Sequence, residues 1–349
     1  MLMDLKEAMM NSIELDNNLG FESRPHKELS GAAFRTAVQL GRTATKNDII
    51  TAYHLHDNVI AEDYYHKLHM ALRMEEYPGK IIDESRSAHS VGMGRILKHR
   101  RAKQNKVGNA MNVAIKPFND IDKAANEVWG YWQLQDLGIE TFDPVGIFSD
   151  PFTTEPLVLT KKRNDFTSLD RDEWIAGGSV QNDQEERQHH KNLAAVRDIA
   201  RVMARMHLNG IFHPDGQIKN FAVTNTGVIG VIDTENLFQI DLTQQNPYPY
   251  AIKDIEKLMR SLVEKAVTQN IKTDQDKLYS VGLFHKNSNS MTRSKYHDLF
   301  LVPYTEQIGQ EINLNPAITS VGELLFENLI EHYYSSEKEQ WPQCLTGRN

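Results

Sequence analysis

The sequence reads HPDGQIKNFAV at residues 213–223 and VID at residues 231–233. In the first segment Asp215 is followed five positions later by Asn220, and the second segment ends on Asp233. This spacing offers one carboxylate that can orient a hydroxyl group and two hard oxygen ligands. Magnesium prefers oxygen ligands and keeps part of its water shell, so one amide, one carboxylate and nucleotide phosphates are enough to hold it. The stretch therefore predicts a phosphoryl-transfer centre, with Asp215 as its catalytic carboxylate and with Asn220 and Asp233 as metal ligands.

Two short apolar runs, at residues 221–223 and 228–232, flank the turn sequence NTG and predict a β-hairpin that begins just after Asn220 and ends just before Asp233. This arrangement resembles the catalytic loop and metal-binding turn of the protein-kinase-like superfamily, in which His-x-Asp, an Asn five positions after the Asp, and an Asp-led triplet follow in this order. The sequence departs from that pattern in two places. Pro214 stands where many kinases have Arg, and DTE at residues 233–235 stands where they have Asp-Phe-Gly.

Upstream, residues 112–118 predict a β-strand that carries Lys116 on one face and β-branched residues on the other. Such a strand could simply extend an edge lysine into water. It also resembles the Val-Ala-Ile-Lys strand with which kinases hold the α- and β-phosphates of ATP.

A helix is predicted over residues 123–137, with Gly138 as its C-terminal cap. Glu127 lies on the apolar stripe of this helix, where an unpaired carboxylate would cost several kcal/mol. It either sits at the wet edge of the stripe or pairs with Lys116, as the corresponding residues do in kinases. The presence of Lys116 upstream favours the pair.

Two further segments fit the same order. The sequence SVGMGR at residues 90–95 predicts a turn at Gly92 and Gly94, which is either a plain hairpin turn or a place where backbone amides approach phosphates. Residues 157–160 form a candidate buried strand, which the resemblance implies is the hinge that binds adenine. Residues 164–190 are polar and predict a loop-rich insertion, and a helix follows at residues 190–208.

The order and spacing of these motifs carry the resemblance, which covers roughly residues 80 to 265. It implies an α+β fold of the bilobal protein-kinase-like type, with a small antiparallel N-lobe sheet plus one helix over residues 79–160 and a mainly helical C-lobe over residues 161–349. Within that superfamily, the sequence most resembles the bacterial lipopolysaccharide kinase, aminoglycoside phosphotransferase and RIO-like branches. A helical stripe from Tyr53 through Ile60, Tyr64 and Leu68 to Ala71 predicts a separate helical module over residues 1–78. That module is a candidate surface for a protein partner.

The composition of the sequence narrows the kind of partner and the cellular compartment that we expect. The chain has 349 residues and a formal net charge of −8, which argues against a nucleic-acid partner because phosphate backbones would be repelled. The single cysteine, Cys344, excludes an intramolecular disulfide and favours a reducing compartment such as the cytoplasm. The first residues have no apolar region of a signal peptide, and no apolar run approaches the ~20 residues of a membrane span.

The resemblance implies an ATP- and magnesium-dependent phosphotransferase. Lys116, held by Glu127, would grip the α/β-phosphates, and Gly92 and Gly94 would cover them. Asn220 and Asp233 would hold magnesium, Asp215 would receive the proton of the acceptor hydroxyl, and Lys219 would steady the transferring phosphoryl group. Only 20 residues separate Asp233 from Asp254, without Ser or Ala-Pro-Glu, which favours a small-molecule acceptor such as a sugar over an extended peptide. Three alternatives stay open: an atypical Ser/Thr protein kinase, a pseudokinase scaffold, and an enzyme that transfers AMP.

Overall fold

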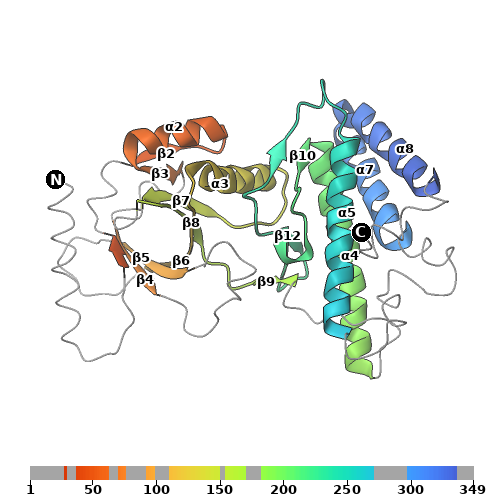
Figure 1. The fold of residues 1–349 in the computed structure, drawn as a ribbon, viewed down its shortest axis with the longest axis horizontal. Helices are drawn as coiled ribbons and strands as arrows, with labels where there is room; N and C mark the ends of the chain where they lie inside the picture. The colour runs from red at the N-terminus through yellow and green to blue at the C-terminus, as the bar shows by residue number, and fades with distance from the viewer. Residues whose placement is uncertain are drawn as a thin grey trace. The chain divides into compact units, whose positions relative to one another are not determined.

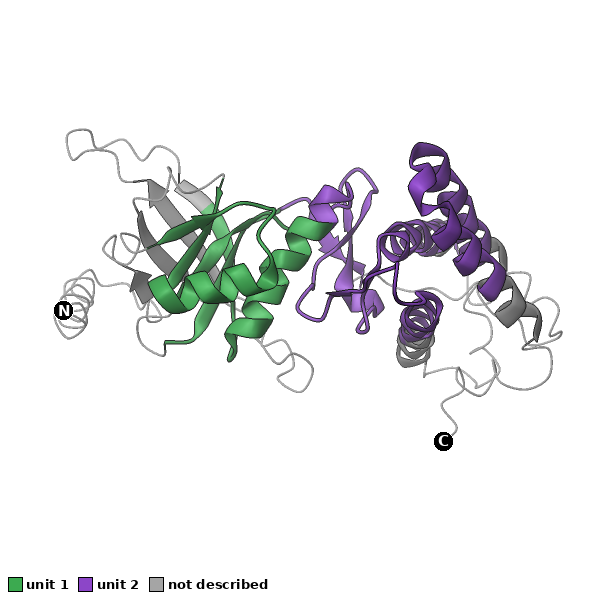
Figure 2. Cartoon of the chain, turned by 90° about the horizontal axis from the view of Figure 1, so that it is seen from above, with its two compact units in different colours: residues 1–133, 142–163 green, residues 134–141, 164–349 purple. Residues whose placement is uncertain are grey.

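The structure is a computed structural model, and it describes residues 27–29, 37–62, 70–75, 92–98, 110–149, 154–169, 182–270 and 297–335. The protein combines β-sheet and α-helix (Figure 1). The chain divides into two compact units, residues 1–133 with 142–163 and residues 134–141 with 164–349 (Figure 2). The first unit holds the large sheet, and the second is mainly helical.

Eight strands of the first unit form one sheet in the order β1-β4-β5-β6-β8-β7-β3-β2. All neighbouring pairs are antiparallel except β2 with β3. The strands are β1 (Lys27–Leu29), β2 (Val38–Leu40), β3 (Asn58–Ala61), β4 (Met70–Glu75), β5 (Gly92–Lys98), β6 (Ala110–Pro117), β7 (Pro144–Ser149) and β8 (Pro156–Lys161). The predicted strands at residues 112–118 and 157–160 are thus β6 and β8.

The core of this unit lies between the sheet and two helices, α2 (Lys46–His56) and α3 (Ile121–Asp136). Val113 and Ile115 of β6 are fully buried in it, whereas Lys116 points to the other face and is only partly buried. The alternation follows from the two-residue period of a strand. The helix predicted at residues 123–137 is α3, and Gly138 follows it with a φ of 66°, the left-handed conformation that glycine adopts without strain.

The prediction of a separate helical module over residues 1–78 is wrong for the described part of that range. Helix α2 ends at Asp57, whose φ is 57°, and all four residues of β3 after it are buried. β3 and β4 then join the sheet that contains β6. The apparent stripe beginning at Tyr53 runs through two kinds of element, because buried β-branched residues on a central strand mimic part of a helical period. Tyr64 and Leu68 lie outside the described residues.

The prediction of a turn at Gly92 and Gly94 is also wrong. Both glycines lie in strand β5, where Gly92 pairs with Ile115, and Gly94 pairs with Val113 on one side and Met74 on the other. A strand tolerates a glycine where neighbouring strands pair with its backbone, and here β6 pairs with both glycines and β4 pairs with Gly94. The preceding residues 76–91 lie outside the described part of the chain.

The second unit contains the long helices α4 (Asp183–Leu208), α5 (Tyr248–Asn270), α7 (Val302–Leu314) and α8 (Thr319–Ser335). Helix α4 packs on α7, and α5 packs on α8 (Figure 1). Helix α4 starts earlier than predicted, because the Asn182 side chain accepts hydrogen bonds from the amides of Gln184 and Glu185 and caps it. The predicted loop at residues 164–190 is therefore helical from Asp183, and residues 170–181 are not described. No helix in the described ranges is long and apolar enough to cross a membrane.

Short strands connect these helices around the motif at residues 213–223. They are β9 (Phe166–Ser168), β10 (Ile211–Phe212), β11 (Phe221–Thr224), β12 (Ile229–Val231) and β13 (Phe238–Gln239). β11 and β12 form the predicted hairpin, with β9 on the other side of β11, and β10 pairs with β13. In β12, Gly230 allows close approach, because a Cβ there would lie 2.4 Å from the carbonyl oxygen of Glu140. The motif thus leaves β10, turns through a 3-10 helix at Ile218–Asn220 and enters β11.

Candidate active site

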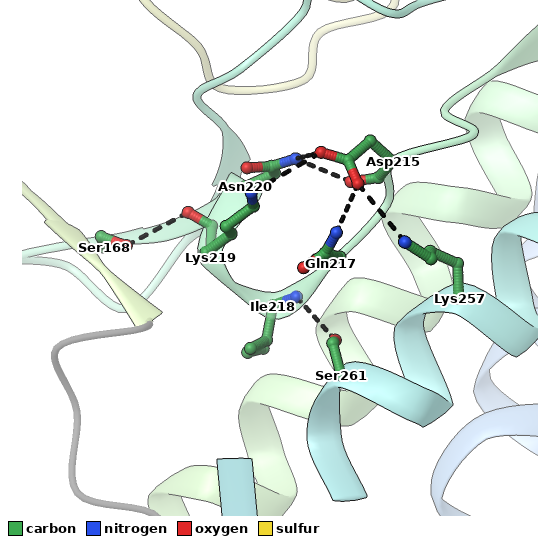
Figure 3. A network of polar contacts seen from close by, with 8 residues as sticks. All are labelled: Ser168, Asp215, Gln217, Ile218, Lys219, Asn220, Lys257 and Ser261. Carbon is green, nitrogen blue, oxygen red and sulfur yellow. Dashed lines mark hydrogen bonds and ion pairs between the residues drawn. The ribbon is translucent and has the colours of Figure 1, made fainter. Parts of the chain in front are cut away.

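The loop between β10 and β11 fixes Asp215 through its own neighbours. Its backbone turns tightly, with the Gly216 amide donating to the His213 carbonyl at 2.7 Å. Asn220 donates from its side-chain nitrogen to the Asp215 carbonyl at 2.6 Å and to Oδ2 of the same residue at 3.2 Å, and Gln217 donates to Oδ1 (Figure 3). The carboxylate is held at both oxygens yet stays 27% exposed, so it remains accessible to a substrate.

The same loop brings Asn220 next to the segment that carries Asp233. The Ile232 amide donates to the Asn220 carbonyl at 2.9 Å, and the Asn220 side chain is buried. Because its amide nitrogen is turned to Asp215, the amide oxygen faces away, and it accepts no hydrogen bond from any residue within the described ranges. The Asn220 amide oxygen and the carboxylate of Asp233, the residue that follows Ile232, are hard oxygen donors of the kind that magnesium prefers.

Two lysines flank Asp215. Lys219 Nζ lies 3.8 Å from Oδ2, and Lys257 Nζ, from helix α5, lies 3.7 Å from Oδ1. Figure 3 shows them approaching the carboxylate from different sides. Both side chains remain about two-fifths exposed, at 43% and 40%. Asp215 is therefore one negative charge between two positive ones, at distances longer than a charge-assisted hydrogen bond.

One face of α5 anchors the whole loop. Asp254, Lys257 and Ser261 are spaced at i, i+3 and i+7, so they lie along one stripe of the helix. Asp254 Oδ2 accepts from the His213 amide at 2.6 Å, and Ser261 Oγ accepts from the Ile218 amide at 2.9 Å (Figure 3). The loop backbone is thus fixed at both ends of the turn that presents Asp215.

Behind the loop, the Asp254 carboxylate belongs to a buried series of hydrogen-bonded side chains. Its Oδ2 lies 3.3 Å from His207 Nε2, and His207 Nδ1 lies 2.7 Å from the hydroxyl of Tyr304 on α7. His207, Asp254 and Tyr304 are each no more than 1% exposed. Because buried polar groups are costly unless paired, this chain ties α4, α5 and α7 to one arrangement.

His213, the first residue of the loop after β10, is buried. Burial lowers its pKa, and the nearby carboxylates of Asp233, Asp254 and Asp215 together with the Asp233 backbone act in the opposite direction without reversing the shift. Its ring nitrogens form no hydrogen bond of good geometry within the described residues. The ring is therefore neutral at pH 7 and adds no positive charge beside Asp215.

In the first unit, Lys116 and Glu127 form the expected pair. Lys116 Nζ lies 3.2 Å from Glu127 Oε1, and the Tyr131 hydroxyl donates to the same oxygen at 2.5 Å. Glu127 is 1% exposed, while the Lys116 side chain is 17% exposed and lies 4.9 Å from the centre of the Phe118 ring. The prediction that Glu127 pairs with Lys116, and does not sit at a wet edge, agrees with this geometry. The buried carboxylate fixes the lysine while leaving part of its ammonium group accessible.

Sequence reasoning missed Gln217, Lys257 and the buried pair of His207 with Tyr304. Gln217 is only two residues from Asp215, and a polar side chain inside so short a motif was the one local signal for it. Lys257 has no such signal, because it reaches Asp215 only through the packing of α5 against the loop. Tyr304 lies farther still along the chain, on a helix that the motif does not predict.

Comparisons with known proteins bear on this geometry. A family model described as the lipopolysaccharide kinase (Kdo/WaaP) family matches residues 111–279, a range that includes Lys116, Glu127, Asp215, Asn220 and Asp233. A search of curated protein sequences found no match. Among solved structures, the kinase domain of a rhoptry antigen specific to Toxoplasma gondii is similar at 12% identity with a TM-score of 0.42, covering 73% of this chain and 82% of that chain.

The family match spans both units and joins the strand of Lys116 to the loop of Asp215 in a single kinase model. The sheet-bearing unit and the helical unit are what a bilobal kinase-like fold requires. Residues 111–279 are thus similar to a lipopolysaccharide kinase family, and this similarity supports a kinase-like phosphotransferase of the protein-kinase-like superfamily.

Proposed function

We propose that the protein is an ATP- and magnesium-dependent kinase that transfers the γ-phosphoryl group to the hydroxyl group of a compact acceptor. One observation carries the proposal. The Asn220 amide holds the Asp215 carboxylate while the Asn220 carbonyl accepts from the Ile232 amide, and these contacts support a shared site for the proposed base Asp215 and the proposed magnesium ligands Asn220 and Asp233. A pseudokinase scaffold has no need of this arrangement.

The residues divide the work by charge and position. Lys116, held by Glu127, would bind the α/β-phosphates, and Asn220 with Asp233 would hold magnesium. Bound magnesium would neutralise charge on the β- and γ-phosphates. Gly92 and Gly94 lie in strand β5, so the phosphate-covering role expected of a turn at these positions is not carried into the proposal.

The transfer itself needs one base and an open approach. The acceptor oxygen forms a bond to the γ-phosphorus as the bond from that phosphorus to the β,γ-bridging oxygen breaks, and ADP leaves with the electron pair. The hydroxyl proton passes to Asp215, whose carboxylate is held in place yet accessible. Lys219, beside Oδ2, would stabilise the charge on the transferring group.

We expect ATP binding to depend on magnesium and to weaken when either Lys116 or Asp233 is replaced by alanine. Lys116→Ala removes the cation for the α/β-phosphates and Asp233→Ala removes a metal ligand, so each should weaken binding by ~10-fold or more, the worth of a charge-assisted interaction. Calorimetry with ATP, in the presence and absence of magnesium, measures the affinity of each variant. The exposed residues Lys123 and Asp136 on α3 give matched controls as alanine variants. If the two site variants bind magnesium-ATP as tightly as these controls, the nucleotide site is wrongly assigned.

The acceptor is proposed to be compact because little chain is available to bind a peptide. Helix α5 begins at Tyr248, and before it β13 is paired with β10 and the Ile240 amide donates to the Gly210 carbonyl at 2.9 Å. Pro249 lies in the first turn of α5, where a missing amide proton costs nothing. The segment after Asp233 is therefore short, and its backbone already pairs with β10 and Gly210. This disfavours strand-like pairing with a substrate peptide.

A labelling screen decides between acceptor classes. With ATP labelled at the γ-position, we expect label in a small hydroxylated molecule and little or none in generic protein substrates. Strong Ser or Thr labelling of protein in trans, without a small-molecule product, would instead establish an atypical protein kinase. ATP labelled at the α-position tests the remaining alternative, AMP transfer, because its label appears in the acceptor only if AMP is transferred.

A further inference from the structure

Strand β12 ends at Val231, two residues before Asp233, and it has a neighbour along each edge. On one edge it pairs with β11. On the other edge Gly230 forms an isolated parallel bridge with Glu140, in the segment that follows α3 and belongs to the same compact unit as the hairpin. A side chain at Gly230 would prevent this approach, because a Cβ there would lie 2.4 Å from the Glu140 carbonyl oxygen. The outer edge of the hairpin is therefore shaped to receive the segment around Glu140.

This outer edge holds both backbone groups of Val231. The Val231 amide donates to the Glu140 carbonyl at 2.9 Å, and the Thr141 hydroxyl donates to the Val231 carbonyl at 2.6 Å. Thr141 and Val231 are both buried, so bulk water has little access to this carbonyl. A buried carbonyl that loses its partner is costly, and the Thr141 hydroxyl therefore contributes to holding the end of β12 in place.

The two edges fix consecutive residues of the chain that leads into Asp233. Val231 is held from the outer edge, and the Ile232 amide is held from the other edge, where it donates to the Asn220 carbonyl at 2.9 Å. After Asp233 the chain is fixed again, because Thr234 is fully buried. Asp233 itself is only partly buried. The backbone of this candidate metal ligand is thus held on both sides while the residue stays accessible.

A buried threonine commonly bonds a nearby backbone group without serving a site. Thr224, at the other end of the same hairpin, is an example, since its Oγ1 accepts from the Val228 amide at 3.0 Å and closes the turn. Thr141 differs in position, because its acceptor lies two residues from Asp233 on the strand that ends there. Its bond also comes from a side chain, so it can be removed without changing the backbone.

We propose that Thr141 is a positioning residue for magnesium binding: by holding the Val231 carbonyl, its hydroxyl sets the backbone position of Asp233. This inference rests on the proposed magnesium-dependent kinase activity. Thr141 touches neither nucleotide nor acceptor in this assignment, and it acts only through the end of β12. Groups that fix a metal ligand commonly contribute to metal affinity nearly as much as their conservation of geometry requires, because a ligand that wanders loses binding free energy.

The first test measures ATP affinity by calorimetry, with magnesium and with a chelator, in the full-length protein. Thr141→Val keeps the shape of the side chain and removes the hydroxyl. We expect it to weaken magnesium-ATP binding by about 10-fold, the lower end of the range for partners of metal ligands, and to leave metal-free ATP binding unchanged. Thr141→Ser keeps the hydroxyl and should bind magnesium-ATP close to the wild-type value. Thr141→Ala replaces the valine variant if that variant does not fold.

The second test needs no ligand. Amide hydrogen exchange in the metal-free protein reports local opening of the hairpin, and we expect faster exchange at Val231 and Ile232 in Thr141→Val than in wild type or Thr141→Ser. Thr224→Val is the matched control, because it removes a buried hydroxyl from the same hairpin at the end away from Asp233. We expect the control to speed exchange near the turn and to leave magnesium-ATP affinity at the wild-type value.

Three outcomes overturn the proposal. The first is wild-type affinity for magnesium-ATP in Thr141→Val. The second is an equal loss of affinity with and without magnesium, or an equal loss in Thr224→Val, either of which would make Thr141 a residue of general stability. The third is a Thr141→Ser variant that binds no better than Thr141→Val. A wild-type protein without magnesium-dependent ATP binding would show instead that the proposed kinase activity is wrong, and this result is seen before any variant is compared.

Discussion

Replacing Asp215 by Asn should lower turnover by roughly 10² to 10⁴ while magnesium-ATP affinity stays at the wild-type value. A positioned acid-base group contributes about this factor, which corresponds to ~3–5 kcal/mol of barrier. The amide is the same size as the carboxylate, its single oxygen can still accept from Gln217, and Asn220 keeps its hydrogen bond to the backbone carbonyl of residue 215, so the loop should keep its shape. The amide cannot take up the proton of the acceptor hydroxyl, and binding and rate should therefore separate.

The measurement pairs steady-state phosphotransfer with calorimetry of magnesium-ATP. Asp241→Asn is the control, since Asp241 is exposed and its side chain bonds only locally to Thr243. Its carboxyl pKa is lowered by those Thr243 hydrogen bonds, so the control replaces an ionised aspartate outside the loop. Unchanged phosphotransfer in Asp215→Asn would move the proton acceptor to another residue. Loss of nucleotide affinity would make Asp215 a binding residue.

Removing the Asp254 carboxylate should destabilise the protein by about 2–5 kcal/mol. The change Asp254→Ala leaves the His213 amide and His207 Nε2 without their buried acceptor, and unsatisfied buried groups of this kind cost a few kcal/mol in total. The catalytic loop also loses an anchor on α5, so residual activity should fall even under conditions where the variant is folded. Denaturant unfolding of the variant, followed by the midpoint and slope, gives the change in free energy of unfolding.

Asp254→Asn is the matched comparison, because its amide oxygen can still accept from the His213 backbone. We expect it to recover a large part of the loss, whereas Asp241→Ala on the surface should leave the free energy of unfolding close to the wild-type value. Equal stability of Asp254→Ala and wild type would mean that water replaces the carboxylate in the buried chain to Tyr304. That result would remove Asp254 as the anchor of the loop.

Several parts of the fold were readable because their cause is local. The alternation around Lys116 predicts β6, and the apolar stripe that ends at Gly138 predicts α3, since periodicity alone specifies which face is buried. The hairpin of β11 and β12 follows from a turn sequence between two apolar runs. The pairing of Lys116 with Glu127 was readable too, because burying a carboxylate on the stripe requires a partner.

Other parts failed because periodicity is ambiguous over short apolar runs. The stripe through Tyr53 and Ile60 predicted one long helix, but a left-handed residue at Asp57 ends α2 and the next buried residues form β3. Gly92 and Gly94 predicted a turn, but β6 pairs with both glycines and β4 pairs with Gly94, so both lie in the sheet. In both cases pairing with strands distant in sequence outweighs the local signal.

The sequence by itself determined the order of the motif residues: Lys116 on a strand, Glu127 on a helix, and Asp215, Asn220 and Asp233 around a hairpin. These are contacts within one element or between neighbours in the chain. Only the tertiary structure decided what surrounds Asp215, because Lys257 and Asp254 come from α5 and Tyr304 from α7. Side chains that meet through helix packing carry no mark of it in a single sequence, since their spacing reflects the face of their own helix and not the loop against which that face is buried.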